Sequence, residues 1–217
     1  VRVDQVSSAE VAERMELARQ VFTLDGSVDD EDFAWGARVS VGLDRLVEDF
    51  DLDSVAYYHR GLDGEQHERL GAGMILGSSL LTARGLPMAG EYELRTSIAQ
   101  VAAQAIGAGG SFTEIQALNF RDGVVEMGHD GPAHLAVSAR DPLLRGLGVF
   151  HGKRGWGVSV EFDVQAATAS SPRRGRSSRA HCWRSATRPH GWTSGATRGS
   201  GSTPGARRAS VTTGRCA

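Results

Sequence analysis

Apolar residues recur at helical spacing through the first half of the chain. In the first such stretch, the apolar positions from Val11 to Phe22 fall on one face of a helix that begins after Ser7. Ser7 and Glu10 have the spacing of a capping box, in which each side chain accepts a hydrogen bond from the other residue's backbone N–H. The same periodicity predicts three further helices, at residues 29–50, 65–84 and 92–106.

The period changes from 3.6 residues to 2 after the glycine-rich segment 107–110. Around the turn Arg121-Asp122-Gly123, this alternation predicts a β-hairpin. The remaining predicted strands are short and lie at 53–59, 135–138, 148–150 and 158–164. This order predicts an α/β protein, with a Rossmann-like or flavodoxin-like α/β segment at 1–108 and a β-rich, barrel-like C-terminal domain at 109–165.

The last 52 residues differ in composition from the rest of the chain. Residues 166–217 contain ten Arg and both cysteines, but no Leu, Ile, Met, Phe, Tyr, Asp, Glu or Lys. Without Leu, Ile, Met, Phe and Tyr the segment cannot bury enough apolar surface to fold, so it is predicted to be a disordered, low-complexity tail. The tail carries a charge of +10, which leaves the body with 14 basic and 26 acidic groups, a net charge of −12.

The composition argues against several classes of protein. An acidic body repels the phosphates of nucleic acids and suits a metabolic enzyme. The longest apolar run is well short of the ~20 residues that span a bilayer, and the N-terminus has no apolar signal-peptide region. Cys182 and Cys216 lack the spacing of a zinc site or a disulfide framework. We therefore expect a cytoplasmic protein that acts on a small molecule and has no membrane partner.

Three polar residues are candidates for chemistry. Glu91 lies in a loop just before a predicted helix, and the predicted hairpin brings Glu114 and His129 to neighbouring strands. Two carboxylates and an imidazole suit Mn²⁺, Mg²⁺ or a similar divalent cation. Each residue also has a structural explanation: a solvated acid in a first helical turn, an exposed strand position and a turn histidine. His134 is either a further ligand or a residue that packs and hydrogen-bonds.

The order of these residues resembles a known superfamily. Gly90-Glu91-Tyr92-Glu93-Leu94-Arg95-Thr96, then Ser111-Phe112-Thr113-Glu114, then Gly128-His129 is similar to the pattern of the L-arabinose isomerase and L-fucose isomerase superfamily, over about residues 1–165. The resemblance implies an aldose–ketose isomerase that depends on Mn²⁺ or another divalent cation. It implies that Glu91 and Glu114 are the proton-transfer pair and metal ligands, and that His129 is a metal ligand. It also implies a homo-oligomer with active sites between subunits.

The same resemblance implies two parts that this sequence does not display. The family has a nucleotide-binding-like domain ahead of the region matched here, and a late Gly-x-x-His-His segment supplies its fourth metal ligand. Read in another frame, the codons of Thr212 and Thr213 permit two consecutive histidines. The hypothesis is therefore that the chain begins within the family's pattern and that residues from about 166 are a frameshift product. The expected isomerase is then an inactive or impaired fragment.

The sequence leaves open two alternatives to a sugar isomerase. The first is a non-enzymatic remnant whose body folds poorly because missing strands leave open sheet edges. The second is a protein whose genuine Arg-rich tail binds nucleic acid or anionic surfaces through counterion release. In that tail only Trp183 and Trp192 offer aromatic stacking.

Overall fold

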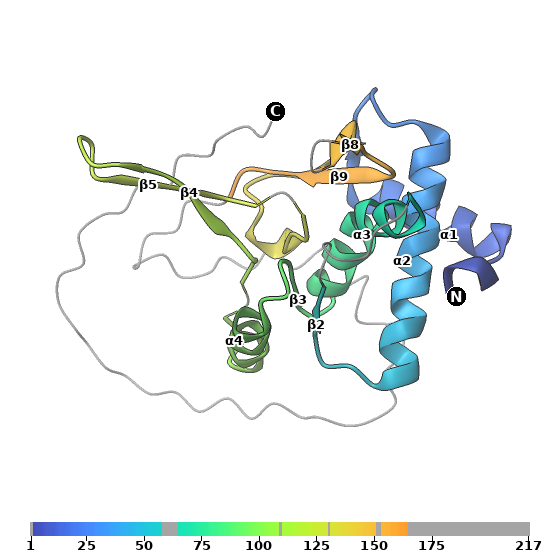
Figure 1. Ribbon diagram of the computed structural model, residues 1–217, viewed down its shortest axis with the longest axis horizontal. Coiled ribbons are helices and arrows are strands. Elements are labelled where there is room, and N and C mark those ends of the chain that lie inside the picture. Colours follow the sequence, from blue (N-terminus) through green and yellow to red (C-terminus); the bar gives the residue numbers. More distant parts are fainter. Residues whose placement is uncertain (1, 58–64, 109, 130, 151–152, 165–217) are drawn as a thin grey trace.

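The computed structural model describes residues 2–57, 65–108, 110–129, 131–150 and 153–164 (Figure 1). Two predictions fall outside these residues: the end of the strand expected at 53–59, and the tail 166–217. The described part is a mixed α/β protein, in agreement with the sequence-based prediction. Within it, none of the helices combines the length and the apolar character that crossing a bilayer requires.

The helical elements of the described residues are η1 (Arg2–Gln5), α1 (Ser8–Val21), α2 (Asp30–Phe50), α3 (Glu65–Ala83), α4 (Leu94–Ala105) and η2 (Leu135–Val137). The strands are β1 (Thr23–Leu24), β2 (Val55–Ala56), β3 (Met88–Ala89), β4 (Glu114–Asn119), β5 (Val124–Gly128), β6 (Leu143–Gly146), β7 (Val149–Phe150), β8 (Lys153–Arg154) and β9 (Val158–Glu161). The four predicted long helices are therefore present, each within two residues of its expected bounds.

Capping residues start the first two long helices. The Ser7 hydroxyl accepts a hydrogen bond from the Glu10 N–H, and the Glu10 carboxylate accepts one from the Ser7 N–H, so the predicted capping box is confirmed. The carboxylate of Asp29 accepts hydrogen bonds from two N–H groups in the first turn of α2. Both helices thus begin at the residues that the sequence pattern indicates.

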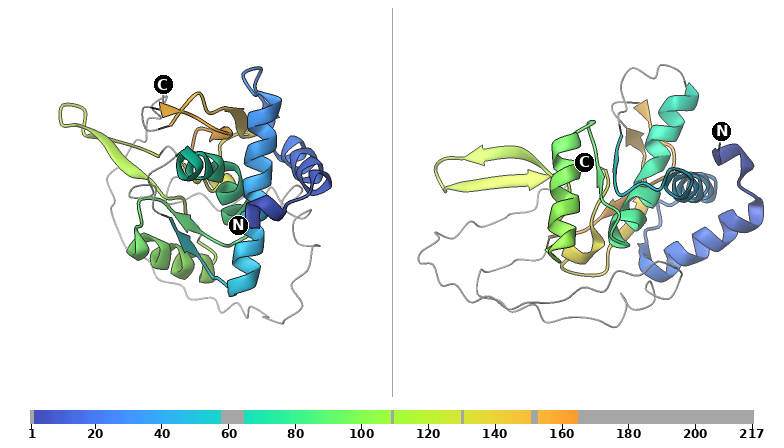
Figure 2. Two further views of the ribbon diagram at one scale, coloured as in Figure 1. Left: turned by 45° about the vertical axis from the view of Figure 1, so that its right-hand side comes forward. Right: turned by 90° about the horizontal axis from the view of Figure 1, so that it is seen from below.

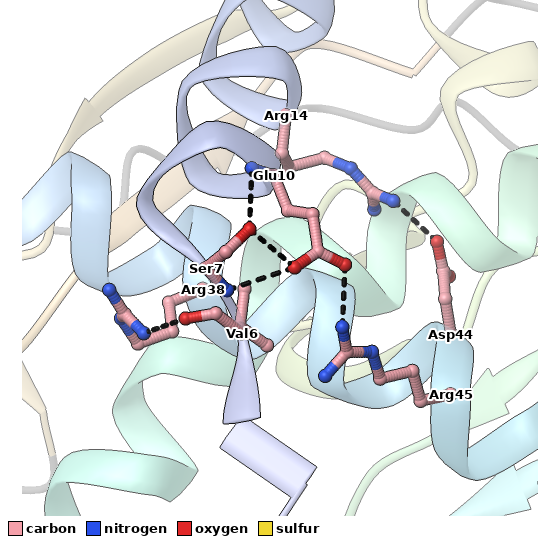
Figure 3. Close-up of polar contacts among 7 residues, drawn as sticks. All are labelled: Val6, Ser7, Glu10, Arg14, Arg38, Asp44 and Arg45. Carbon is pink, nitrogen blue, oxygen red and sulfur yellow. Dashed lines mark hydrogen bonds and ion pairs between the residues drawn. The ribbon is translucent and has the colours of Figure 1, made fainter. Parts of the chain in front are cut away.

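Ion pairs join these helices to each other and to the end of α3. Glu10 of α1 pairs with Arg45 of α2, and Arg14 of α1 pairs with Asp44 of α2, each at 2.5 Å (Figure 3). Asp44 also pairs with Arg84, which follows α3. The side chains of Arg14 and Asp44 are only 13% and 14% exposed. Asp44 therefore ties three helices together from a largely buried position.

The largest core lies between the helices and a three-stranded sheet. In this sheet β6 is central, parallel to β1 and antiparallel to β9. The buried side chains of this core come from α1, α2, α3 and the segment around the sheet: Ala18, Phe22, Phe33, Ala72, Ile75, Leu76, Leu80, Leu144, Leu147, Val158 and Val160. Because β1 precedes residue 108 whereas β6 and β9 follow it, segments on both sides of the predicted domain boundary share one sheet and one core.

A second core places the short parallel pair β2–β3 against α2 and α3. Its buried residues are Val3, Val39, Leu43, Leu81, Leu86 and Met88. The two helices approach closely here, since a Cβ atom on Gly77 would lie 2.7 Å from the Cα atom of Ser40. β2 pairs with β3 through Val55 with Met88 and Ala56 with Ala89. This packing fixes the carboxyl ends of both strands, where the candidate site lies.

Several elements differ from the prediction, among them the short strands β1, β6 and β8, which were not predicted. Residues 135–138, expected as a strand, contain the 3₁₀-helix η2, because Nδ1 of His134 accepts a hydrogen bond from the Ala136 N–H and turns the backbone. The strand β3, which comes just before the predicted loop at Glu91, was not predicted either. The barrel-like C-terminal part is not seen: the described strands form sheets of two or three strands and close no barrel.

The predicted hairpin is present as β4 and β5. It extends away from the body of the molecule, beside the end where α4 lies (Figure 2). Every residue of β4 is exposed to solvent. Among the described strands, β4 and β5 pair only with each other.

Candidate functional site

The candidate site lies at the carboxyl edge of the parallel pair β2–β3. Tyr57 follows β2, and Gly90 follows β3. The pairing continues past both strands, because the Tyr57 N–H donates to the carbonyl of Ala89 (3.2 Å) and the Tyr92 N–H donates to the carbonyl of Tyr57 (2.9 Å). In open α/β sheets, this edge is where ligands bind.

Glu91 stands on a strained turn between β3 and α4. Its φ is +56° and that of Tyr92 is +59°, so two consecutive residues other than glycine adopt the left-handed conformation. Such residues cost on the order of 1–3 kcal/mol each and are found most often at functional sites. The turn is closed by the Glu93 N–H, which donates to the Gly90 carbonyl at 3.0 Å. It leaves the Glu91 side chain exposed, just before the first turn of α4.

His129 packs against the backbone of this turn. Its Cε1 and Nε2 atoms lie 3.2 Å from the position that a Cβ atom on Gly90 would occupy. The ring meets Phe112 edge-on, with centroids 4.4 Å apart and an interplanar angle of 90°. A Cβ atom on Gly131 would lie 2.6 Å from the His129 Cε1 atom and 3.2 Å from the Tyr57 hydroxyl oxygen. Two glycines therefore make room for this imidazole at the strand edge.

Glu114 reaches the same region through the hairpin register. It is the first residue of β4 and pairs with Gly128, the residue before His129. Opposed residues on antiparallel strands share a face, and the next residue along points to the other face. By this register, Glu114 is adjacent to the backbone at Gly128, and His129 is the first residue after β5. Its side chain is exposed.

These positions allow a test of the expected metal site. In the part of the chain that the structure describes, no group of three or more His, Cys, Asp or Glu side chains is close enough to hold a metal ion. The segments that carry Glu91 and His129 are in contact, and Glu114 is one register position away. The donor types suit a hard divalent cation, but these three side chains do not form a joined ligand set here, so the fit is partial.

His134 has a structural role in this region. It is buried, and burial lowers the pKa of its imidazole. The backbone N–H of His134 donates to the hydroxyl oxygen of Ser111 at 3.1 Å, and the backbone N–H of Ala133 donates to the hydroxyl oxygen of Ser79 on α3 at 3.2 Å. Of the two roles that the sequence left open, these contacts favour packing and hydrogen bonding. They hold the segment after His129 against α3.

The sequence pattern did not single out Tyr57 and Phe112 as site residues. Tyr57 lies within the strand expected at 53–59, and Phe112 precedes the acid on which the motif centres. The sequence gives no signal for Tyr57, because the predicted strand continues past it; only the end of β2 at Ala56 places Tyr57 at the edge where ligands bind in open α/β sheets. Phe112 gives no signal either, because its contact with His129 depends on the hairpin.

Neither a model of a known protein family nor a curated protein matches this chain.

Proposed function

We propose that this chain carries the catalytic part of a metal-dependent aldose–ketose isomerase, of the type that acts on L-arabinose or L-fucose. One observation supports this proposal above the others: the His129 imidazole lies 3.2 Å from the Cβ position of Gly90, beside Glu91. Two motifs that are distant in sequence thus meet at the edge where ligands bind in an α/β fold. The third motif residue, Glu114, is held one register position from His129.

In the proposed reaction the two carboxylates move protons. One of Glu91 and Glu114 removes the proton from C2 of an open-chain aldose, and the other helps to return a proton at C1, while a hydroxyl proton passes from O2 to O1. A bound Mn²⁺ or other divalent cation supplies positive charge that stabilises the sugar oxygens as charge develops on them. Glu91, Glu114 and His129 are the residues that would hold it. Both glutamates are exposed, as befits a site that a neighbouring domain or subunit completes.

The proposal also covers the architecture of the complete enzyme and the origin of residues 166–217. A Rossmann-like or flavodoxin-like segment followed by a barrel-like domain would be the architecture of the complete enzyme. The homo-oligomer and the frameshift origin of residues 166–217 are part of the same hypothesis, which makes this chain an impaired fragment. The alternative, an Arg-rich tail that binds nucleic acid or anionic surfaces, concerns residues outside those that the structure describes.

A Mn²⁺ titration tests the proposal. We expect Mn²⁺ to bind the full chain saturably, as measured by thermal melting and by electron paramagnetic resonance. The variants Glu91→Gln, Glu114→Gln and His129→Asn should each weaken this binding about tenfold or more. Glu13→Gln, which alters an exposed acid on α1, is the matched control and should bind as the parent does. Conversion of L-arabinose and L-fucose to the ketoses is measured in parallel. Absence of any saturable Mn²⁺ effect on melting would contradict the proposal.

A further inference from the structure

Tyr92 carries an exposed aromatic ring at the carboxyl edge of the β2–β3 pair. It follows Glu91 in the turn between β3 and α4, and its side chain is 59% exposed (Figure 1). Exposure of a single apolar side chain is common and needs no special explanation. The backbone of Tyr92, however, adopts a conformation that is uncommon for a residue with a bulky side chain.

The turn that holds Tyr92 favours small residues. The φ of Tyr92 is +59° and that of Glu91 is +56°, and the Glu93 N–H donates to the Gly90 carbonyl at 3.0 Å. A hydrogen bond of this kind across two residues with positive φ is typical of a type I′ turn. The two central positions of such a turn favour Gly, Asn and Asp, because the left-handed conformation brings other side chains too close to the backbone. The stability of the turn therefore does not explain a glutamate followed by a tyrosine.

Hydrogen bonds on both sides fix the backbone of Tyr92. Its N–H donates to the Tyr57 carbonyl at 2.9 Å, which ties the turn to the end of β2. Its carbonyl accepts from the N–H of Leu94, the first residue of α4, at 3.0 Å. Between them, Glu93 has a φ of −82° and a ψ of 81°, close to the values of an inverse γ-turn. The exposed ring is thus attached to a backbone that is held between a strand end and a helix start.

The neighbours of Tyr92 are the groups on which the proposed function depends. Glu91 is the preceding residue, and the backbone of the same turn lies against the His129 imidazole. Glu93, the other acid of the turn, is paired with Arg95 through two hydrogen bonds of 3.2 and 3.4 Å. An open-chain sugar presents hydroxyl groups, which hydrogen-bond to carboxylates, and C–H groups, which are slightly positive. The face of an aromatic ring is negative and attracts such groups. Glu91 and Tyr92 together match both kinds of surface.

We propose that Tyr92 is a substrate-binding residue whose ring lies against the C–H groups of an open-chain sugar or polyol, while Glu91 binds the adjacent hydroxyl groups. This inference rests on the proposed function, because it concerns the same site, and it adds the residue that recognises the carbon chain of the substrate. Residues held in unfavourable backbone conformations cluster at functional sites. The left-handed backbone of Tyr92 is then the conformational cost of placing an aromatic ring beside Glu91.

Binding of L-arabinitol to the full chain tests this inference. L-Arabinitol is an open-chain polyol without a carbonyl group, so it cannot be isomerised, and saturation-transfer NMR in the presence of Mg²⁺ measures its dissociation constant. Tyr92→Asn removes the ring but keeps a residue that tolerates the left-handed conformation, and it should weaken binding about threefold to tenfold. Tyr92→Phe keeps the ring and should bind as the parent does. The control is Phe120→Ala, which removes a ring that is 89% exposed at the hairpin turn and should leave the affinity unchanged.

Two further measurements on Tyr92→Asn separate recognition of the polyol from a structural role of the ring. Its affinity for Mn²⁺ should equal that of the parent, because the substitution alters none of the proposed metal ligands. Its melting temperature should equal that of the parent or rise by about 1–4 °C, because Asn relieves part of the strain. If stability and polyol binding fell together, the ring would be supporting the fold, and the inference would be overturned. Unchanged affinity of Tyr92→Asn for L-arabinitol would also overturn it.

The behaviour of the parent separates this inference from the proposed function. A parent that binds Mn²⁺ but not L-arabinitol overturns the role of Tyr92 and leaves the metal site standing. A parent that binds L-arabinitol but not Mn²⁺ overturns the metal-dependent isomerase, whereas the role of Tyr92 is supported if Tyr92→Asn weakens polyol binding. A parent that binds neither overturns both.

Discussion

The imidazole of His129 lies against Gly90, with its Cε1 and Nε2 atoms 3.2 Å from the Cβ position of that glycine. Phe112 Cε1 is 3.3 Å from the same position, and the Cβ position of Gly131 is 2.6 Å from the His129 Cε1 atom. The contact joins the turn after β3 to the segment after β5. It therefore fixes the distance between the two motifs that carry Glu91 and His129.

Gly90→Ala is expected to destabilise the protein. The added methyl group would meet two aromatic rings at 3.2–3.3 Å, and the His129 ring also lies close to the backbone of Gly131, which restricts its movement. Overpacking of this kind costs about 1–3 kcal/mol in the free energy of unfolding, measured by urea denaturation. Gly26→Ala is the control, because nothing lies within 4 Å of its Cβ position, and it should change stability by less than about 0.5 kcal/mol. Equal effects at both positions would show that the imidazole moves aside freely.

Asp44→Ala is expected to cost far more stability than the removal of an exposed ion pair. Asp44 pairs with Arg14 (Figure 3) and also with Arg84, and its side chain is 14% exposed. Removing one partner of a buried pair costs about 3–5 kcal/mol, and partial exposure places Asp44 toward or below the lower end of that range. Asp49→Ala breaks the exposed pair with Arg2 and should cost at most about 1 kcal/mol. Denaturation of both variants under one set of conditions checks the difference.

Local signals predicted the long helices well. Each of these signals lies within a few residues of the helix end that it marks, and each observed end is within two residues of its signal. The signals are the Ser7–Glu10 capping box, the acids at the start of α2 and the glycine after α3. The hairpin was predictable for the same reason, since its turn and its alternation are local. The short strands β1, β3 and β6 were missed because two- to four-residue strands depend on partners far along the chain, as Thr23 does on Leu143.

The site was predictable only in part. The motif order identified Glu91, Glu114 and His129 as candidates, and the hairpin register explains why Glu114 and His129 are neighbours. The contact between His129 and Gly90 depends on how the hairpin packs on the β2–β3 edge, which no local pattern encodes. For the same reason, the sequence did not predict that the apolar side chains Leu94, Ile98 and Ile106 of α4 are exposed. Helical periodicity predicts which side chains share a face, but not which face packs against the rest of the protein.

Asp51→Gly is expected to stabilise the protein. Asp51 is the C-cap of α2 and has a φ of +48°, a left-handed conformation that glycine adopts without steric cost. Its side chain is exposed, so little packing is lost. The gain should be about 0.5–1 kcal/mol in the free energy of unfolding. Asp53→Gly, at an exposed position without positive φ, serves as the control and should destabilise, because there glycine only adds freedom to the unfolded chain. A loss of stability in Asp51→Gly would contradict the prediction.

The capping box at Ser7 predicts a specific dependence of stability on pH. The pKa of the Glu10 carboxyl is lowered from 4.5 to about 2, chiefly by the hydrogen bond from the Ser7 hydroxyl, with further contributions from the Ser7 N–H and from Arg45 (Figure 3). Because the folded-state pKa lies below the unfolded value, the carboxylate contributes stability above pH 4.5. That contribution is lost as the pH falls from 4.5 through about 2.

Ser7→Ala removes the largest cause of this shift, so the pKa of Glu10 in the folded state should rise toward 4.5. The variant should be less stable than the parent by a constant amount above pH 5, and the difference should narrow as the pH falls from 4.5 to about 2. Part of the difference should persist at low pH, because the hydroxyl also accepts from the Glu10 N–H whatever the charge of the carboxyl group. Ser8→Ala, at the first residue of α1, is the control, and its free energy of unfolding should depend on pH in the same way as that of the parent. If the parent and Ser7→Ala differed by a constant free energy of unfolding down to pH 2, the hydrogen bond from Ser7 would not be what stabilises the Glu10 carboxylate.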